Sequence, residues 1–245
     1  MSAQTLNRLR ELKLNGMVTA LEHQQRQIGT FEGLAFTERL DMLLEREQGL
    51  RENRKQDRLI QQAKFKLNAC VQQIEYGHKR NIRKDTVARL AQCDWVARKQ
   101  NLLITGPCGS GKTYLACAVG HAACLRDYRV RYFRLSRLFL ELTQAKADGS
   151  YSKLLRQLAR VDVLLLDDWG LEPLQQSQRH DLMEILDDRH GTTSTIVISQ
   201  LPTDQWYAGI GDNTLADAIL DRLMHNAHDI KLQGESMRKV LGQLT

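Results

Sequence analysis

The 245-residue sequence lacks an apolar run long enough to span a membrane, and its first thirty residues lack the apolar core of a signal peptide. Aromatic residues are few, at 6%, whereas the hydrophobic share of 42% is ordinary for a globular protein. Internal repeats and low-complexity segments are also missing. We therefore expect a soluble cytoplasmic protein with one large domain, or a domain of about 150 residues plus a smaller one.

Cysteine occurs at only five positions, with no C-x-x-C pair and no histidine at a metal-ligand spacing. Cys117 and Cys124 lie seven residues apart, which places them on one face of a predicted helix. The pattern favours reduced cysteines that pack in the core over a zinc site.

The net charge of +6 is unevenly distributed along the chain. Residues 1–100 hold 19 Lys and Arg against 12 Asp and Glu, whereas residues 101–245 hold 16 against 17. A basic half joined to a nearly neutral half suggests an anionic partner for the first, although a solvated helix face would give the same count.

The N-terminal part is predicted to be helical, with apolar residues at helical spacing and breaks at Gly29-Thr30 and Gly49. Residues 51–67 form a strongly basic helical stretch, and residues 78–84 form a second basic cluster in a loop or at a helix entrance. We place the domain boundary near residues 65–75. The predicted domains are a small helical domain over 1–70 and a second domain over 71–245.

From Leu102 onward, strand-like and helical stretches alternate. Five apolar runs read as strands: 102–105, 130–133, 161–166, 195–199 and, more weakly, 229–232. Helical patterns separate them at 114–126, 137–147, 154–159, 177–189 and 215–226. This alternation predicts an α/β fold with a five-stranded parallel sheet that helices flank on both faces. Ligands in such sheets bind beyond the carboxyl ends of the strands.

A glycine-rich segment between the first strand and the next helix matches the pattern G-x-x-x-x-G-K-[ST] at every required position. Strand, glycine loop and helix is the context of a P-loop, whose backbone N–H groups surround phosphates at a helix N-terminus. Lys112 is expected to reach the β- and γ-phosphates, and the Thr113 hydroxyl to bind Mg²⁺. The predicted nucleotide-binding residues are Gly106, Pro107, Cys108, Gly109, Ser110, Gly111, Lys112, Thr113 and Tyr114.

Two carboxylates follow the third predicted strand. Asp167 is predicted to hold hydrated Mg²⁺ together with Thr113, and Asp168 to orient and deprotonate the attacking water. Paired aspartates also cap turns, but their place about fifty residues after a P-loop favours nucleotide hydrolysis. Ser199 and Gln200 end the fourth predicted strand, where polar groups can sense a γ-phosphate or the water, or simply form a turn before Pro202.

These residues together resemble the IstB-like transposition helper ATPases, a AAA+ family related to the DnaC-like helicase loaders. The resemblance covers nearly the whole chain and includes Leu12-Lys13-Leu14-Asn15-Gly16-Met17, 101–107, 165–170, 199–202, 216–222 and 234–238. It implies a sheet in which the Ser199 strand lies between the P-loop strand and the Asp167 strand. It further implies that Arg222 is an arginine finger for a neighbouring subunit, that Arg238 is a sensor arginine, and that Ser199-Gln200 occupy the first sensor position.

The same resemblance implies an ATP- and Mg²⁺-dependent homo-oligomer that assembles on duplex DNA, bends it, and recruits or activates a transposase. We expect no C-terminal lid domain and slow basal hydrolysis, because Asp168 stands where Glu is more common and Gln200 where Asn is. Candidate DNA contacts are Arg54, Lys55, Arg58, Lys79, Arg80, Arg83 and Lys84, each of which could equally be part of a solvated face. Two alternatives stay open: a helicase loader that prefers single-stranded DNA, and a nucleotide-gated protein–protein adaptor that does not hydrolyse ATP.

Overall fold

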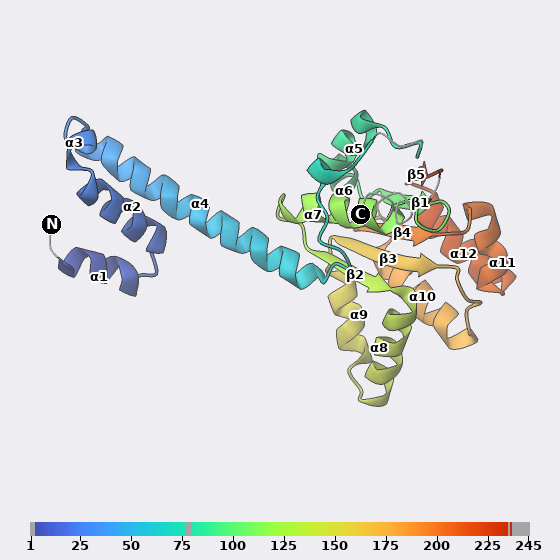
Figure 1. Cartoon of the computed structure of the whole chain (residues 1–245). Coiled ribbons are helices and arrows are strands. Elements are labelled where there is room, and N and C mark those ends of the chain that lie inside the picture. Colours follow the sequence, from blue (N-terminus) through green and yellow to red (C-terminus); the bar gives the residue numbers. More distant parts are fainter. Residues whose placement is uncertain (1–2, 77–79, 235, 237–245) are drawn as a thin grey trace. The chain divides into compact units, whose positions relative to one another are not determined.

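The computed structural model describes residues 3–76, 80–234 and 236. Its internal contacts divide the chain into two compact units, Met1–Arg58 and Leu59–Thr245 (Figure 1). This division lies N-terminal to the predicted boundary at residue 70. The reason is that Leu59 and Ala63, in the last turns of helix α4, are buried in the hydrophobic core of the second unit. Within the described residues, no helix combines the length and apolar character that crossing a bilayer requires.

The first unit is helical, as expected. It contains α1 (Ala3–Glu11), α2 (Asn15–Arg26), α3 (Ile28–Phe31) and the part of α4 (Phe36–Ala63) up to Arg58. The predicted break at Gly49 is wrong, because α4 runs through this position without interruption. A single glycine costs an otherwise well-formed helix only about 1 kcal/mol relative to alanine, which its helix-favouring neighbours can offset.

Hydrogen bonds near both ends of α2 join this helix to α4 within the unit. At one end, the Gly16 main-chain N–H donates to the Glu47 carboxylate at 2.7 Å. At the other end, the Gln24 amide donates to the main-chain oxygen of Arg39 at 3.0 Å and accepts from its Nε at 3.2 Å. Because Glu47 and Gln24 are both almost fully buried, these contacts fix the register of the two helices.

The second unit is built on a parallel five-stranded sheet, which confirms the predicted fold. Its strands are β1 (Asn101–Thr105), β2 (Val130–Arg134), β3 (Val163–Trp169), β4 (Ser194–Ser199) and β5 (Ala227–Lys231). Their order is β2-β3-β4-β1-β5, so the Ser199 strand lies between the P-loop strand and the Asp167 strand, as the family resemblance implied. All the carboxyl ends therefore meet at one edge of the sheet.

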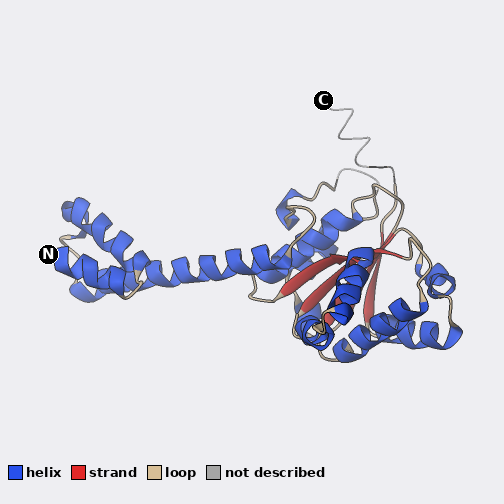
Figure 2. Ribbon diagram, turned by 90° about the horizontal axis from the view of Figure 1, so that it is seen from below, coloured by secondary structure: helices blue, strands red, loops and turns tan. Residues whose placement is uncertain are grey.

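Helices cover both faces of the sheet (Figure 2). Side chains that alternate along the strands explain this, since Leu102 and Ile104 enter one core cluster and Leu103 enters the other. The first face carries α5 (Lys84–Ala91), α6 (Asp94–Ala97) and α7 (Lys112–Cys124), preceded by a short 3₁₀ turn, η1 (Val71–Gln73). The second face carries α8 (Leu135–Ala147), α9 (Tyr151–Ala159), α10 (Gln176–Arg189), α11 (Trp206–Ile210, after the 3₁₀ turn η2, Thr203–Gln205) and α12 (Asn213–Met224).

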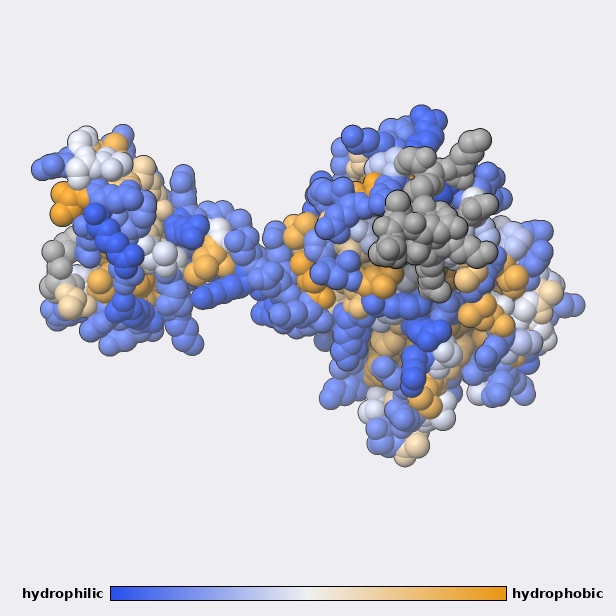
Figure 3. Space-filling model, in the orientation of Figure 1, coloured by the Kyte–Doolittle hydropathy of each residue, from blue (hydrophilic) through white to orange (hydrophobic). Residues whose placement is uncertain are grey.

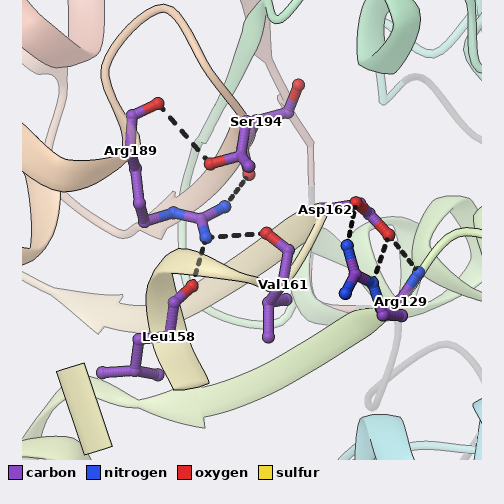
Figure 4. Close-up of polar contacts among 7 residues, drawn as sticks. Arg129, Leu158, Val161, Asp162, Arg189 and Ser194 are labelled. Atoms are coloured by element: carbon purple, nitrogen blue, oxygen red, sulfur yellow. Dashed lines mark hydrogen bonds and ion pairs between the residues drawn. The ribbon is translucent and has the colours of Figure 1, made fainter. Parts of the chain in front are cut away.

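A buried arginine ties together the amino-terminal edge of the sheet (Figure 4). Arg189 is 2% exposed, and its guanidinium donates to the main-chain oxygens of Leu158 at 2.6 Å, Val161 at 2.8 Å and Ser194. These acceptors lie at the end of α9, before β3 and at the start of β4. Arg189 is thus a structural residue that satisfies carbonyl groups left free between elements.

Candidate functional site

The segment from Gly106 to Thr113 connects the carboxyl end of β1 to the first turn of α7. Its glycines adopt backbone conformations that other residues rarely take, with φ of 145° at Gly106 and 93° at Gly111. At Gly106 a Cβ atom would lie 2.4 Å from the main-chain oxygen of Leu232, so only glycine fits there. The loop thus leads tightly into the N-terminus of α7, whose N–H groups suit a bound phosphate.

Two polar side chains of this loop are almost fully buried. Lys112 is 7% exposed, and its Nζ donates to the main-chain oxygen of Pro107 at 2.8 Å, so the ammonium folds back over the loop. Burial lowers the pKa of Lys112. The Oγ of Ser110, which is 0% exposed, has no hydrogen-bond partner in the part of the chain that is described. Tyr114, on the first turn of α7, directs its hydroxyl to Gln73 at 3.3 Å.

The structure brings Asp167 next to the P-loop. Asp167 is 2% exposed, and its Oδ2 accepts from the Thr113 hydroxyl at 3.1 Å and from the Tyr132 hydroxyl at 2.7 Å. The ammonium of Lys66 lies 3.5 Å from the same oxygen. Burial, followed by the hydrogen bond to Asp167, raises the pKa of Tyr132, so this hydroxyl remains a donor at neutral pH. A hydroxyl and a carboxylate at this spacing are oxygen ligands suited to Mg²⁺.

Asp168 follows Asp167 at a β-bulge, where the register of β3 against β4 shifts between Leu166 and Trp169. Its φ of 62° is left-handed, a conformation that Asp tolerates better than most residues. The bulge turns the Asp168 carboxylate toward Arg134, whose Nε donates to it at 2.6 Å. This hydrogen bond is the main cause that raises the pKa of Arg134. Asp168 therefore lies beside the Thr113–Asp167 pair but is itself engaged by a cation.

The two polar residues at the end of β4 differ in their surroundings. Ser199 is 1% exposed, and its hydroxyl donates to the main-chain oxygen of Trp169 at 2.8 Å and accepts from the Leu201 N–H at 3.0 Å. These hydrogen bonds join the ends of β3 and β4, so the Ser199 hydroxyl stabilises the structure at this point. Gln200 is exposed at the carboxyl edge of the sheet.

Arg222 lies at the opposite edge of the sheet from the P-loop. Its main-chain oxygen accepts from the Asn101 side chain at 3.1 Å, and Asn101 begins the strand whose far end enters the P-loop. The Arg222 guanidinium pairs with Asp187 at 2.7 Å and lines a cavity of about 280 Å³ together with Arg98 and Lys99. Arg222 thus does not contribute to the P-loop of its own chain. Arg238 lies outside the described residues.

Most candidate DNA contacts are exposed, but one is not. Arg54, Lys55 and Arg58 are exposed on α4, and Arg83 and Lys84 are exposed at the start of α5. On the face that Figure 3 shows, the visible part of α4 is mostly hydrophilic. Lys79 lies outside the described residues.

The prediction that Arg80 contacts DNA is wrong. This residue is only 6% exposed, and its guanidinium lies beside Gly111 of the P-loop. A buried arginine that packs against a glycine loop cannot present its charge to a DNA backbone.

Sequence reasoning did not single out Lys66 or Tyr132 as site residues. Lys66 belongs to the basic stretch recognised in the sequence, but nothing there shows that the chain brings it to Asp167. Tyr132 sits two residues before the end of β2, the strand that pairs with β3, so a known sheet order could have found it. Both depend on tertiary structure that periodicity does not encode.

Comparison with known proteins identifies the family. The model of the family described as IstB-like ATP binding protein matches residues 7–243, so the chain belongs to this family. The insertion sequence ATP-binding protein y4pL of Sinorhizobium fredii is 46% identical over 235 residues, covering 96% of each chain. The insertion sequence IS21 ATP-binding protein of Pseudomonas aeruginosa is 33% identical over 205 residues, covering 84% of this chain and 77% of the relative.

Solved structures show the same fold. The DnaC helicase loader aligns with a TM-score of 0.57 at 22% identity over 69% of this chain and 99% of its own. DnaA from Aquifex aeolicus, with bound AMPPCP, aligns with a TM-score of 0.58 at 19% identity over 74% of this chain and 55% of its own. The second unit therefore has the fold of DnaC and DnaA.

Proposed function

We propose that this chain is an ATP-dependent transposition helper that assembles on duplex DNA and recruits or activates a transposase. Its membership in the IstB-like family and its likeness to insertion sequence ATP-binding proteins support this function. The observation that carries the enzymatic part is the contact between Thr113 and Asp167 at the P-loop. It joins the two halves of a hydrolytic site that lie far apart in the sequence.

The residues present fit ATP and Mg²⁺. The buried Ser110 hydroxyl without a partner among the described residues suits a phosphate oxygen, and Thr113 with Asp167 supplies oxygen ligands for the metal. When bound, Mg²⁺ would neutralise charge on the β- and γ-phosphates. Lys112 would bind the phosphates, which requires its ammonium to leave the carbonyl oxygen of Pro107.

Asp168 is the residue that we assign to orienting the attacking water and accepting its proton. Its ion pair with Arg134 has a consequence for this role, because a carboxylate oxygen that accepts from a guanidinium is not free to accept a hydrogen bond from a water molecule. Hydrolysis is then slow until a neighbouring subunit, DNA or the transposase draws Arg134 away. ATP would act mainly as a switch for assembly.

Arg222 is the residue that we assign to the site of a neighbouring subunit. Its place at the edge of the sheet opposite the P-loop supports a role in another chain. To reach a neighbour's phosphates the guanidinium must leave Asp187, which is itself exposed and therefore binds it only weakly. We expect Arg222→Ala to abolish hydrolysis and to loosen ATP-dependent oligomers. Hydrolysis at the wild-type rate in this variant would contradict a shared site.

Exposed cations on α4 and at the start of α5 are the proposed DNA contacts: Arg54, Lys55, Arg58, Arg83 and Lys84. Contacts of this kind go to phosphates, so binding should depend little on sequence and strongly on salt.

The test is binding of labelled duplex and single-stranded DNA, in ATP and in ADP, at two salt concentrations, with Lys112→Ala as control. ATP-dependent, salt-sensitive binding that prefers the duplex, yields large complexes and disappears in the control is the expected result. A preference for single strands would favour a helicase loader. Absent binding together with absent ATPase activity would favour a protein–protein adaptor.

A further inference from the structure

Arg80, shortly before α5, lies against the P-loop. Arg80 is 6% exposed, and its Nη1 lies 3.0 Å from the position that a Cβ atom would take on Gly111. Its Nη2 donates to the main-chain oxygen of Glu75. Its Nε is buried and has no hydrogen-bond partner among the residues that the structure describes.

Main-chain pairing holds Arg80 in this place. Its carbonyl oxygen accepts from the Gln233 N–H at 3.0 Å, and the Asn81 side chain donates to the main-chain oxygen of Lys231 at 3.3 Å. The residues after β5 are anchored in turn, since the Leu232 N–H donates to Thr105 at 2.8 Å. Thr105 is the last residue of β1, directly before the P-loop. Arg80 is therefore fixed to the same edge of the sheet as the loop that it contacts.

The chemistry of this position points to an anion. A guanidinium is buried at a cost unless carboxylates, phosphates or carbonyl oxygens engage its donors. Among the described residues, the Arg80 guanidinium donates to one carbonyl oxygen, that of Glu75. Gly111 directly precedes Lys112, so Nη1 lies where the P-loop enters the helix N-terminus. A guanidinium can donate two parallel hydrogen bonds to phosphate oxygens. A purely structural hydrogen bond to one carbonyl oxygen does not need this pair of donors.

We propose that Arg80 binds the phosphate chain of the nucleotide, adding a second cation to that of Lys112. This inference rests on the proposed ATP site. In this proposal, Arg80 contributes directly to nucleotide affinity. Gln233, after β5, holds it in position by a main-chain hydrogen bond. A contact to the phosphates also predicts that Arg80 matters as much for a phosphate chain without a base as for ATP.

The experiment measures, by calorimetry on the full chain, the binding of ATP and of tripolyphosphate. Arg80→Met, which keeps the length of the side chain but removes its charge, should weaken both by about 10- to 100-fold. Arg80→Lys should recover part of the affinity. Arg89→Met is the matched control, because Arg89 is an exposed arginine on α5 that pairs with Asp85 at 4.0 Å; it should bind both probes like the wild type.

Thermal unfolding of each unliganded variant separates an effect on phosphate binding from an effect on the stability of the fold. If Arg80→Met melts earlier, binding is compared well below its melting temperature, and recovery by Arg80→Lys still supports the phosphate contact. Wild-type affinity in Arg80→Met, or a loss that Arg80→Lys does not recover at all, would overturn the proposal. Failure of the wild-type protein to bind ATP would instead overturn the proposed nucleotide site, and Arg80 with it.

Discussion

At Gly16 the backbones of α2 and α4 lie close together, and replacement of this glycine by alanine tests the packing. A Cβ atom at Gly16 would lie 2.5 Å from the Cα of Glu47 and 2.7 Å from the main-chain oxygen of Arg46. Both are backbone atoms, so no side-chain rotation can relieve the clash. The helices would have to separate by roughly 0.9 Å to reach ordinary contact at 3.4 Å.

That separation has a second cost, because Glu47 caps α2 from the neighbouring helix. Its Oε2 accepts from the Gly16 N–H at 2.7 Å and from the Met17 N–H at 3.3 Å, whereas the residue before α2, Leu14, offers no side-chain cap. Moving the helices apart by nearly an ångström would break these bonds and leave a buried carboxylate poorly satisfied. We expect Gly16→Ala to destabilise the N-terminal unit by about 2–4 kcal/mol.

Hydrogen exchange of the full chain measures this effect, with faster exchange expected in α2 and in the part of α4 that faces it. ATP binding should stay at the wild-type level, because the P-loop lies in the other unit. Gly49→Ala is the matched control: nothing lies within 4 Å of its Cβ position, and it should stabilise α4 by about 0.5–1 kcal/mol. Exchange in Gly16→Ala that equals the wild type would refute the close approach.

The acid stability of the same unit follows from Glu47. Burial acts to raise its pKa, but hydrogen bonds from Arg51 and from the Gly16 and Met17 amides outweigh burial and hold the pKa below the ordinary value of 4.5. The folded state therefore gains stability above pH 4.5 and loses it as the pH falls through the lowered pKa. Glu47→Gln should remove this part of the acid dependence, as urea unfolding at pH 3, 4 and 7 would show. An identical pH profile in the variant would contradict it.

Two further predictions concern the nucleotide site. Cys108 is exposed on the P-loop, whereas burial raises the pKa of Cys117 to about 11 and of Cys124 to about 12, so at pH 8 iodoacetamide should modify Cys108 well before these two. Peptide mapping should show that MgATP slows the modification of Cys108; an unchanged rate would count against nucleotide at the loop. Lys66→Met removes a cation 3.5 Å from Asp167 and should lower the Mg²⁺ concentration needed for ATP binding by about two- to fivefold. An unchanged requirement would show that Lys66 does not oppose the metal.

The sheet and the P-loop could be predicted because local sequence encodes them. Apolar runs of strand length, glycines at fixed offsets and helical periodicity each depend on a few neighbouring residues, and strand order followed from the family resemblance. The same local signals misled at Gly49, where glycine predicted a break but α4 continues. A glycine in a helix is tolerated where nothing near it demands another conformation.

The surroundings of the site could not be predicted, because they depend on which segments the fold brings together. Arg80 stands in a run of basic residues, and its sequence neighbours Arg83 and Lys84 are exposed as a solvated cluster should be. Arg80 is buried instead, and its main chain pairs with Gln233, more than 150 positions along the chain. The Ser199 hydroxyl is likewise taken up by Trp169 of a neighbouring strand. Arg80 and Arg83 thus have similar sequence neighbours but differ in burial, which local sequence does not encode.

Described residues from the early and the late parts of the second unit lie at the P-loop. Lys66 comes from the connection after α4, and Arg80 comes from the segment before α5. Leu232 comes from the residues after β5 and lies against Gly106. A bound phosphate chain would therefore contact, or lie next to, three segments that carry no P-loop residue. If Arg80 binds the phosphates, nucleotide affinity depends on the pairing between the residues before α5 and the end of β5. Asn81→Ala removes the side-chain hydrogen bond to the main-chain oxygen of Lys231. This variant should therefore weaken ATP binding, although Asn81 is not proposed to contact the nucleotide.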